Sequence, residues 1–130
     1  MNTRRDDFMV LPFRMGDLVD VLLVQSEAGS EWRLPSGPCR KGLPQHESAA
    51  WEARRQAGVS GQIYKRPLRP SNQERRVNIF PLLVQVETAA TMGSRTTARW
   101  FSLQDAAQMV DKDASDALDA FARRIGWRAP

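Results

Sequence analysis

Most side chains of this chain that could do chemistry lie between Trp32 and Gly61. Glu52 stands in an alanine-rich segment, where a carboxylate could ligate a metal ion or act as a general base. Cys39 is followed directly by Arg40 and Lys41, and neighbouring cations lower the pKa of a thiol. The plainer interpretations are a hydrogen-bonded helix glutamate and an unreactive loop thiol, and for both residues we favour the plainer one.

Basic side chains form a second group of candidate functional residues. The chain has 19 Lys and Arg against 15 Asp and Glu, a formal net charge of +4. This balance permits a polyanionic partner such as a nucleotide, an inositol phosphate or RNA, but a solvated basic surface with no specific partner explains it equally well. Where phosphate contacts exist, we expect them from five residues: Arg40, Lys41, Arg66, Arg75 and Arg76.

The elements that position these side chains begin with strands. Apolar runs at 8–14 and 18–26 are strand-like, and the Met-Gly-Asp sequence between them predicts a hairpin turn. Further strands are expected at 32–35, 59–67, 77–87 and 99–103. Pro81 lies inside the fifth of these six segments, and this placement predicts an edge strand or a bulge there.

Three helices are expected. The segment 44–57 is rich in good helix formers, and Ala49, Ala53 and Ala57 form one narrow apolar face that could lie close against a sheet. Gly58 stands where a left-handed C-cap belongs. Two later helices are predicted at the end of the chain: 102–110, with Ser102 as N-cap, and 114–127. This order of elements predicts a mixed sheet with helices on its faces.

The same residues resemble the MutT-like Nudix hydrolase family. The family signature is G-x5-E-x7-R-E-U-x-E-E-x-G-U, where U is aliphatic. Without any gap, Gly37 falls on its first glycine, and Gly58 and Val59 fall on its last two positions. Glu52 falls on the glutamate of the Arg-Glu pair and Ala53 on the aliphatic position. The stretch "GPCRKGLPQHESAAWEA" is also similar to the subgroup related to diphosphoinositol polyphosphate phosphohydrolases.

This resemblance implies a fold, a reaction and a cofactor. The expected fold is an α/β/α sandwich of the α+β class, with a mixed sheet flanked by helices, as one Nudix-like domain over residues 1–130. The expected substrates contain a diphosphate, either a nucleoside diphosphate linked to another group or a diphosphoinositol polyphosphate. The family uses Mg²⁺ or Mn²⁺, held by glutamates at i, i+3 and i+4 that share one helix face, to activate the attacking water.

The chain departs from the family where the metal would bind. The signature has Glu, Arg, Glu and Glu at the positions of Leu43, Trp51, Arg55 and Gln56. Of the glutamates in the signature, only Glu52 therefore remains. Gln56 offers at most a neutral oxygen. An arginine about 5 Å from a divalent ion would be repelled by roughly 6–7 kcal/mol at an effective dielectric of about 20. We therefore expect the metal to be poorly held or not held. The retained motif residues serve turn geometry, capping and close packing: Gly37, Ala53, Gly58 and Val59.

Two functions stay open. One is a phosphohydrolase with weak or no activity, in which Glu52 and Gln56 are the residual catalytic candidates. The other is a non-catalytic Nudix-fold module that binds a phosphorylated ligand, a nucleic acid or a protein. The replaced motif residues favour this second function. Among ligands, a nucleotide or inositol polyphosphate is favoured over nucleic acid. The sequence leaves the oligomeric state open.

Composition and apolar runs exclude other classes. A content of 42% hydrophobic and 26% charged residues is typical of a globular protein rather than a disordered one. No membrane partner is expected, because the longest apolar run, 21–24, is far shorter than the ~20 residues that span a bilayer. Cys39 is the only cysteine, which excludes an internal disulfide and favours the cytoplasm.

Overall fold

A computed structural model describes residues 7–26, 31–70, 77–88 and 96–126. Within this part of the chain the strands form one seven-stranded mixed sheet. The strands are β1 (Phe8–Met15), β2 (Val19–Ser26), β3 (Trp32–Arg33), β4 (Ser36–Gly37), β5 (Val59–Ile63), β6 (Asn78–Glu87) and β7 (Thr96–Ser102). The helices are α1 (Gln45–Ala57), α2 (Leu103–Met109) and α3 (Lys112–Ile125).

Strand β1 lies at the centre of the sheet. It pairs in parallel with β6 over six residues, and β6 pairs antiparallel with β5. On its other side β1 pairs with β2 only next to their hairpin, from Phe13 opposite Val21 to Met15 opposite Val19. Beyond this point the two strands separate, so β4 pairs with β1, while β3 and the long β7 pair with β2. The segment 32–37 therefore crosses from β2 to the start of β1, close to α1.

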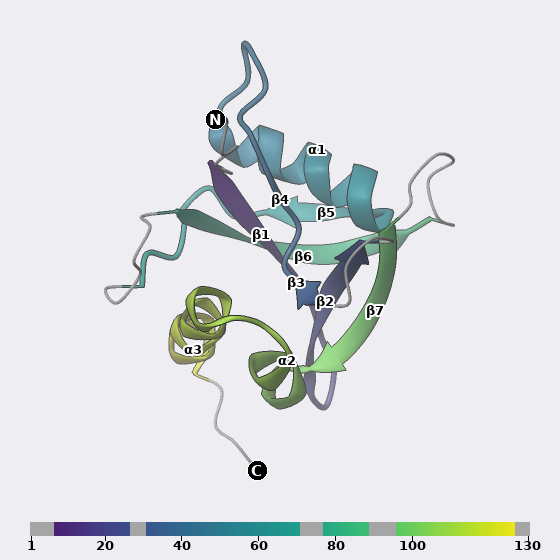
Figure 1. Ribbon diagram of the computed structural model, residues 1–130, viewed down its shortest axis with the longest axis vertical. Coiled ribbons are helices and arrows are strands. Elements are labelled where there is room, and N and C mark those ends of the chain that lie inside the picture. Colours follow the sequence, from purple (N-terminus) through teal and green to yellow (C-terminus); the bar gives the residue numbers. More distant parts are fainter. Residues whose placement is uncertain (1–6, 27–30, 71–76, 89–95, 127–130) are drawn as a thin grey trace.

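The helices cover both faces of the sheet. Helix α1 lies on one face, and α2 and α3 lie on the opposite face (Figure 1). The core beneath α1 contains Phe8, Val10, Leu22, Ala49, Ala53, Val59, Phe80 and Leu82. The other core includes Leu11, Phe13, Val21, Leu23, Ile79, Leu103, Ala117, Leu118 and Phe121. The expected α/β/α sandwich is confirmed.

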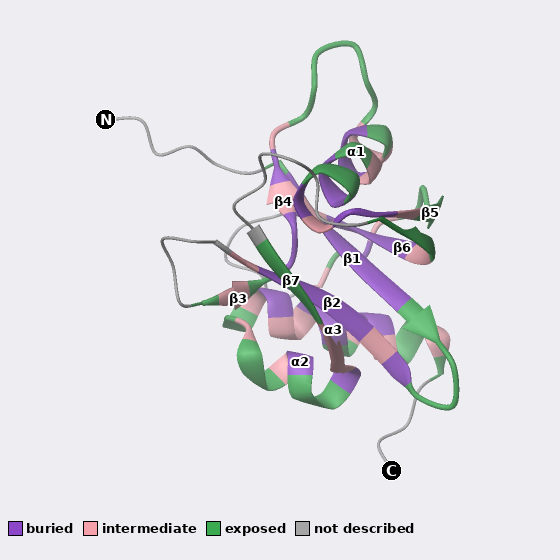
Figure 2. Cartoon of the chain, turned by 90° about the vertical axis from the view of Figure 1, so that its right-hand side faces the viewer, coloured by how far each residue is buried: buried purple, intermediate pink, exposed green. Residues whose placement is uncertain are grey.

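Burial on both faces explains the strand sequences. In β1, Phe8 and Val10 face the core beneath α1, whereas Leu11 and Phe13 face the other core. The ring centroid of Phe13 lies 4.7 Å from that of Phe121 on α3. Figure 2 shows that buried residues dominate β1 and β2. A strand buried on both faces reads as a continuous apolar run instead of an alternating one, which is the pattern of this segment.

The predicted packing face of α1 is confirmed. Ala49 and Ala53 are fully buried, and Ala57 packs partly buried against the same core. Gly58 adopts φ 69° and donates its backbone N–H to the Arg54 carbonyl, as a left-handed C-cap does. Trp51 is 37% exposed on the outer side of the helix. Small side chains on the inner side let the helix lie close to the sheet.

The predicted role of Pro81 is wrong. Strand β6 lies between β1 and β5 and is not an edge strand, and the register shift in the β5–β6 pair falls at Ser60/Gly61. Within a strand, the N–H and C=O of one residue point to the same side. The Pro81 carbonyl accepts from Tyr64 N just beyond the last residue of β5, so the missing N–H faces a position where the ladder has ended.

The two closing helices begin at side-chain caps. Ser102 Oγ accepts from Asp105 N at 3.1 Å, as predicted for the helix that follows it. Helix α3 starts at Lys112, two residues earlier than the pattern indicated, because Asp111 Oδ1 accepts from Ala114 N at 2.9 Å. Among the described residues, no helix is long and apolar enough to cross a membrane.

Candidate functional site

Glu52 lies in a buried hydrogen-bonded cluster on α1. Its side chain is buried, and the residue is 3% exposed. Its Oε1 accepts from Arg55 Nη2 at 2.7 Å, from Arg55 Nε at 3.0 Å and from Gln56 Nε2 at 2.8 Å. A buried carboxylate is costly unless donors and a countercharge surround it. Arg55 and Gln56 supply both, and they stand at the two positions where the motif has glutamates.

Gln56 connects this cluster to strand β4. Its Nε2 also donates to the Ser36 carbonyl at 2.7 Å, so the amide nitrogen lies between two acceptor oxygens. A flipped amide would place its oxygen against both of them, and this fixes the orientation of the group. Gln56 Oε1 then points elsewhere, buried and without a hydrogen-bond partner among the described residues. The side chain therefore fastens α1 to β4 and keeps one acceptor unused.

Gly37 is needed because Glu52 lies against it. A Cβ at Gly37 would be 2.9 Å from Glu52 Cδ and 3.0 Å from Glu52 Cγ. Gly37 belongs to strand β4 and does not have a positive φ. Its motif role here is therefore close approach between a strand and a helix rather than turn geometry.

This contact predicts an interaction between Gly37→Ala and Glu52→Ala. Gly37→Ala alone is expected to lower the free energy of unfolding by about 1–3 kcal/mol, because Arg55 and Gln56 hold the glutamate in place. In a chain that already carries Glu52→Ala, the same methyl group fills vacated space and should cost much less. Urea unfolding of the four chains measures the difference. Additivity within about 0.5 kcal/mol would contradict the contact.

The residues of this cluster do not fit a magnesium or manganese ion. Both ions prefer several oxygen ligands, whereas here one carboxylate faces a guanidinium and an amide nitrogen. Among the residues that the structure describes, no group of three or more His, Cys, Asp or Glu could hold a metal. The positive group that balances the Glu52 carboxylate is Arg55.

Arg40 is the closer arginine to Trp51. The Arg40 Cζ atom lies 3.6 Å from the centroid of the indole ring, and the Arg55 Cζ atom lies 5.6 Å away. Arg55, one turn along the helix from Trp51, is also within cation–π range of the ring while it donates to Glu52. The loop before α1 brings Arg40 closer to the same ring.

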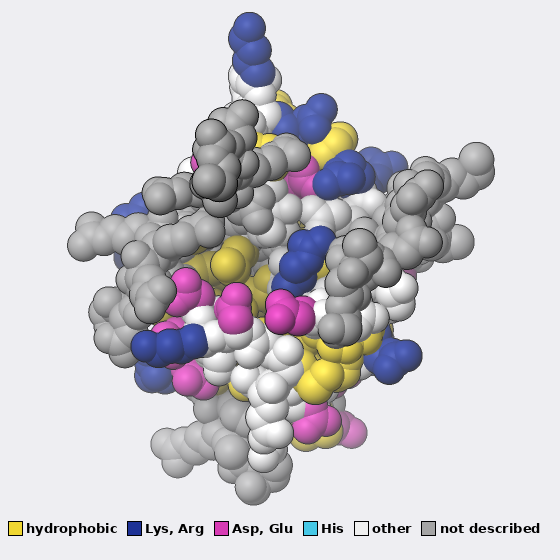
Figure 3. Space-filling model, in the orientation of Figure 1, with side chains coloured by type: hydrophobic (Ala, Val, Ile, Leu, Met, Phe, Trp, Pro, Cys, Tyr) yellow, Lys and Arg dark blue, Asp and Glu magenta, His cyan; other side chains and the backbone are white. Residues whose placement is uncertain are grey.

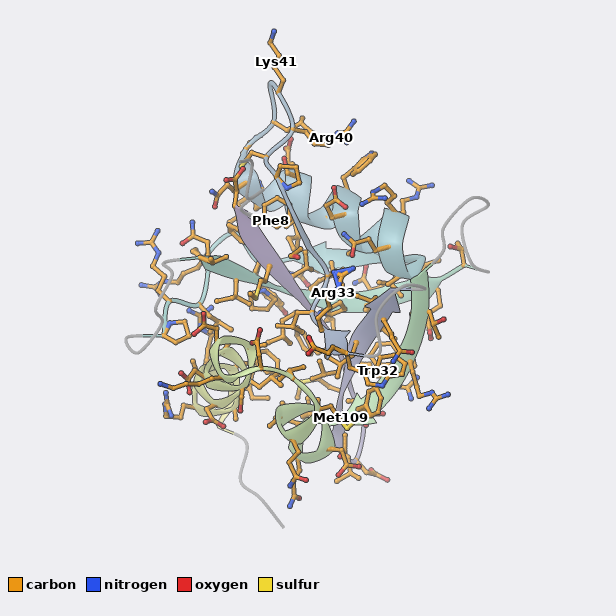
Figure 4. All side chains as sticks on the ribbon, viewed as in Figure 1. Phe8, Trp32, Arg33, Arg40, Lys41 and Met109 are labelled. Atoms are coloured by element: carbon orange, nitrogen blue, oxygen red, sulfur yellow. The ribbon has the colours of Figure 1, made fainter. Side chains whose placement is uncertain are left out.

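The five expected phosphate-binding residues lie in different parts of the molecule. Arg40 and Lys41 project from the loop next to α1 (Figure 4). Arg66 lies in the segment after β5, where its carbonyl and that of Pro67 accept from Arg124 on α3. Helices α1 and α3 cover opposite faces of the sheet. Arg75 and Arg76 lie outside the described residues. Of the three residues of this set that the structure describes, Arg40 and Lys41 lie beside α1 and Arg66 does not.

The pKa of Cys39 is raised and not lowered, which favours the unreactive loop thiol over a thiol activated by Arg40 and Lys41. Partial burial raises the pKa of the thiol, and the negative charge of Asp7 raises it further; a hydrogen bond with Gln45 acts in the opposite direction. Asp7 comes close because its Oδ2 accepts from the backbone N–H of Cys39 at 2.8 Å. Burial is the largest of these causes.

Alkylation of Cys39 by iodoacetamide is expected to be slower than that of a free cysteine at pH 8. A raised thiol pKa lowers the fraction of thiolate at a given pH, and the thiolate is the nucleophile. Asp7→Asn should therefore speed the reaction, with the pH midpoint of the rate moving downward. Asp17→Asn, in the exposed turn between β1 and β2, is the control and should change neither. An unchanged rate in Asp7→Asn would contradict this assignment.

Sequence patterns missed three residues of this region. Ser48 is fully buried on α1, and its Oγ accepts from the backbone N–H of Arg40 at 2.9 Å. The Ser36 carbonyl accepts from Gln56, and Asp7, which precedes β1, accepts from the Cys39 N–H. Only Ser48 had a signal in the sequence, because it is a polar residue beside alanines on the buried side of the helix. The other two contacts depend on the paths of distant segments.

Comparison with known proteins identifies the fold. The sequence matches no protein-family model and no curated protein. Several solved structures are similar along nearly the whole chain. A NUDIX hydrolase structure from Listeria monocytogenes has a TM-score of 0.69 at 15% identity, covering 95% of each chain. The Ap4A hydrolase of C. elegans, in a binary complex, has a TM-score of 0.67 at 15% identity, covering 91% of this chain and 95% of that one.

A third similar structure contains a ligand. The NUDIX domain of Shewanella oneidensis NrtR, complexed with ADP ribose, has a TM-score of 0.67 at 18% identity and covers 91% of this chain and 86% of that one. At these identities the likeness concerns the fold. The chain has the Nudix fold, as the spacing of its glycines and alanines indicated.

Proposed function

We propose that this Nudix-fold protein binds a small molecule containing a diphosphate and hydrolyses it weakly or not at all. The observation that carries the proposal is the Glu52 cluster, in which the remaining motif carboxylate is already neutralised by Arg55 and hydrogen-bonded by Gln56. A carboxylate that receives three hydrogen bonds is a poor ligand for a further cation. Metal-activated water would need that ligand first.

The expected ligand is a nucleoside diphosphate derivative, with an inositol polyphosphate as the second choice. One similar structure is of an Ap4A hydrolase and another is of a domain complexed with ADP ribose, and both compounds contain linked phosphates. The basic residues beside α1 suit such a ligand, since guanidinium groups bind phosphate oxygens through paired hydrogen bonds. The same proposal places the protein in the cytoplasm, as one domain over residues 1–130.

Binding and turnover measured together test this proposal. Calorimetry with ADP-ribose and with Ap4A, each with and without Mg²⁺ or Mn²⁺, should show binding that hardly depends on the metal. Product analysis of the same mixtures should show turnover far below the median of enzymes, about 10 per second. Hydrolysis near that rate would establish an active hydrolase and overturn the proposal that the protein hydrolyses its ligand weakly or not at all. No binding of either compound, or of an inositol polyphosphate, would overturn the ligand class.

A further inference from the structure

We propose that Arg40, which lies over the ring of Trp51, forms a phosphate-binding platform on the outer face of α1, apart from the Glu52 cluster. The inference rests on the proposed function, because it names the residues that receive the phosphate. Its first support is the stacking distance of 3.6 Å between Arg40 Cζ and the indole centroid. A stacked guanidinium uses its flat face for the ring and keeps the N–H donors at its edge for a phosphate group.

The backbone holds Arg40 in this place. Its N–H donates to the buried hydroxyl of Ser48, and its carbonyl accepts from Leu43 N at 3.1 Å. On the preceding residue, the Cys39 N–H donates to Asp7 at 2.8 Å. Gly42, with φ 84° and open space where a Cβ would lie, lets the loop turn back toward the helix. A guanidinium fixed in this way loses little conformational entropy when an anion binds.

Local charge favours an anion at this platform. The two ion pairs found within the described residues join Arg14 to Asp20 and Arg55 to Glu52, so neither neutralises Arg40. Lys41 follows it in the same loop and is exposed. On the face that Figure 3 shows, several Lys and Arg side chains lie at the upper end, over α1 and its loop, while most of the visible Asp and Glu side chains lie in the lower half. This separation steers an anion toward α1.

The recognised group is a phosphate rather than a nucleobase. Arg40 covers the indole at stacking distance, and Arg55 lies 5.6 Å from the same ring, so the aromatic surface is already in use. The guanidinium edge is the part that remains able to donate. A phosphate can come from a free diphosphate compound or from a nucleic-acid strand, and the two sources differ in how strongly salt weakens binding.

Titration of ADP-ribose and of a short single-stranded oligonucleotide tests the platform. Arg40→Ala should weaken binding by about 10-fold or more, as expected for loss of charge-assisted hydrogen bonds. Trp51→Leu should weaken it less, because the charge stays while its orientation is lost, and Arg40→Lys should not restore full affinity because an ammonium lacks the planar fork. Arg54→Ala, an exposed arginine on the same helix, is the matched control and should change affinity by about 2-fold at most.

The binding results distinguish failure of the platform from failure of the proposed function. Loss of ADP-ribose binding in Arg40→Ala, with unchanged melting temperature and unchanged Arg54→Ala, supports the platform. A second outcome is tighter binding of the oligonucleotide that depends steeply on salt and is lost in Arg40→Ala. This result supports the platform, identifies nucleic acid as the source of the phosphate and overturns the small-molecule ligand. Binding of ADP-ribose that Arg40→Ala and Trp51→Leu leave intact overturns the platform alone. Absence of binding to both probes in the wild-type protein overturns the platform and the proposed function together.

Discussion

Replacing Trp51 by Arg, Arg55 by Glu and Gln56 by Glu in one chain is expected to raise the affinity for Mg²⁺ on the order of 100-fold or more. The change removes the guanidinium from the Glu52 carboxylate and places three carboxylates on one helix face. Even groups that only support a metal ligand are worth about 10–100-fold in metal affinity, and two added ligands are worth more. Calorimetric titration with Mg²⁺ measures the gain.

The same variant should depend on the metal for stability. Gln56 is 7% exposed and donates to the Ser36 carbonyl, so a glutamate there loses that bond and faces two oxygens. Without metal we expect a loss of about 3 kcal/mol in the free energy of unfolding. Mg²⁺ at 100 times its Kd would return about 2.7 kcal/mol. Thermal unfolding with and without Mg²⁺ should therefore separate the variant from the wild-type protein.

Arg54→Glu is the matched control for this experiment. It makes the same charge change as Arg55→Glu on an exposed neighbouring position of α1, away from the Glu52 carboxylate. It should leave Mg²⁺ affinity within a few-fold of the wild type. A folded triple variant with no gain in Mg²⁺ affinity would show that the motif is not where the alignment places it. Strong Mg²⁺ binding by the wild-type protein would show that other groups complete the site.

Gly61→Ala is expected to lower the free energy of unfolding by about 3 kcal/mol or more. A Cβ at Gly61 would lie 1.9 Å from the Leu83 carbonyl oxygen and 2.8 Å from Gln85 N. Both neighbours are backbone atoms of β6, which is paired with β1 on its other side. The clash cannot be relieved by a rotamer change, so the β5–β6 pair must open at its register shift.

Gly16→Ala is the comparison for this substitution. Gly16 lies in the turn between β1 and β2, and a Cβ there would meet only the Leu18 carbonyl at 3.9 Å, an ordinary contact. Both substitutions reduce the freedom of the unfolded chain equally, so their difference reports the folded state. Urea unfolding of both variants gives that difference. A loss below about 1 kcal/mol in Gly61→Ala would show that the bulge is placed differently.

Local patterns predicted the elements of this fold well. Ala49 and Ala53 face the sheet, Gly58 caps α1 and Ser102 caps α2, as the sequence indicated. Each of these features depends on residues within about one or two helical turns, and helix periodicity and capping chemistry act over that range. The motif spacing added the expected sandwich, since the glycines and alanines stand where a helix must approach a sheet closely.

Two expectations missed contacts between distant segments. Pro81 was assigned to an edge because a proline lacks a donor, but only the end of β5 shows that no partner is required there. The cations next to Cys39 allowed for a lowered thiol pKa, but burial of the thiol raises the pKa, and the charge of Asp7 raises it further.

The sequence by itself determined the order of the elements, the inner face of α1 and the loss of motif carboxylates, because these follow from residue types and short spacings. The tertiary structure decided what replaced the carboxylates. It placed Gly37 against Glu52, joined Gln56 to Ser36 and brought Arg40 over Trp51. Such contacts arise where α1, β4 and the loop between them pack together, and the exact approach of these segments is set by the shared core beneath α1 rather than by any of their own sequences.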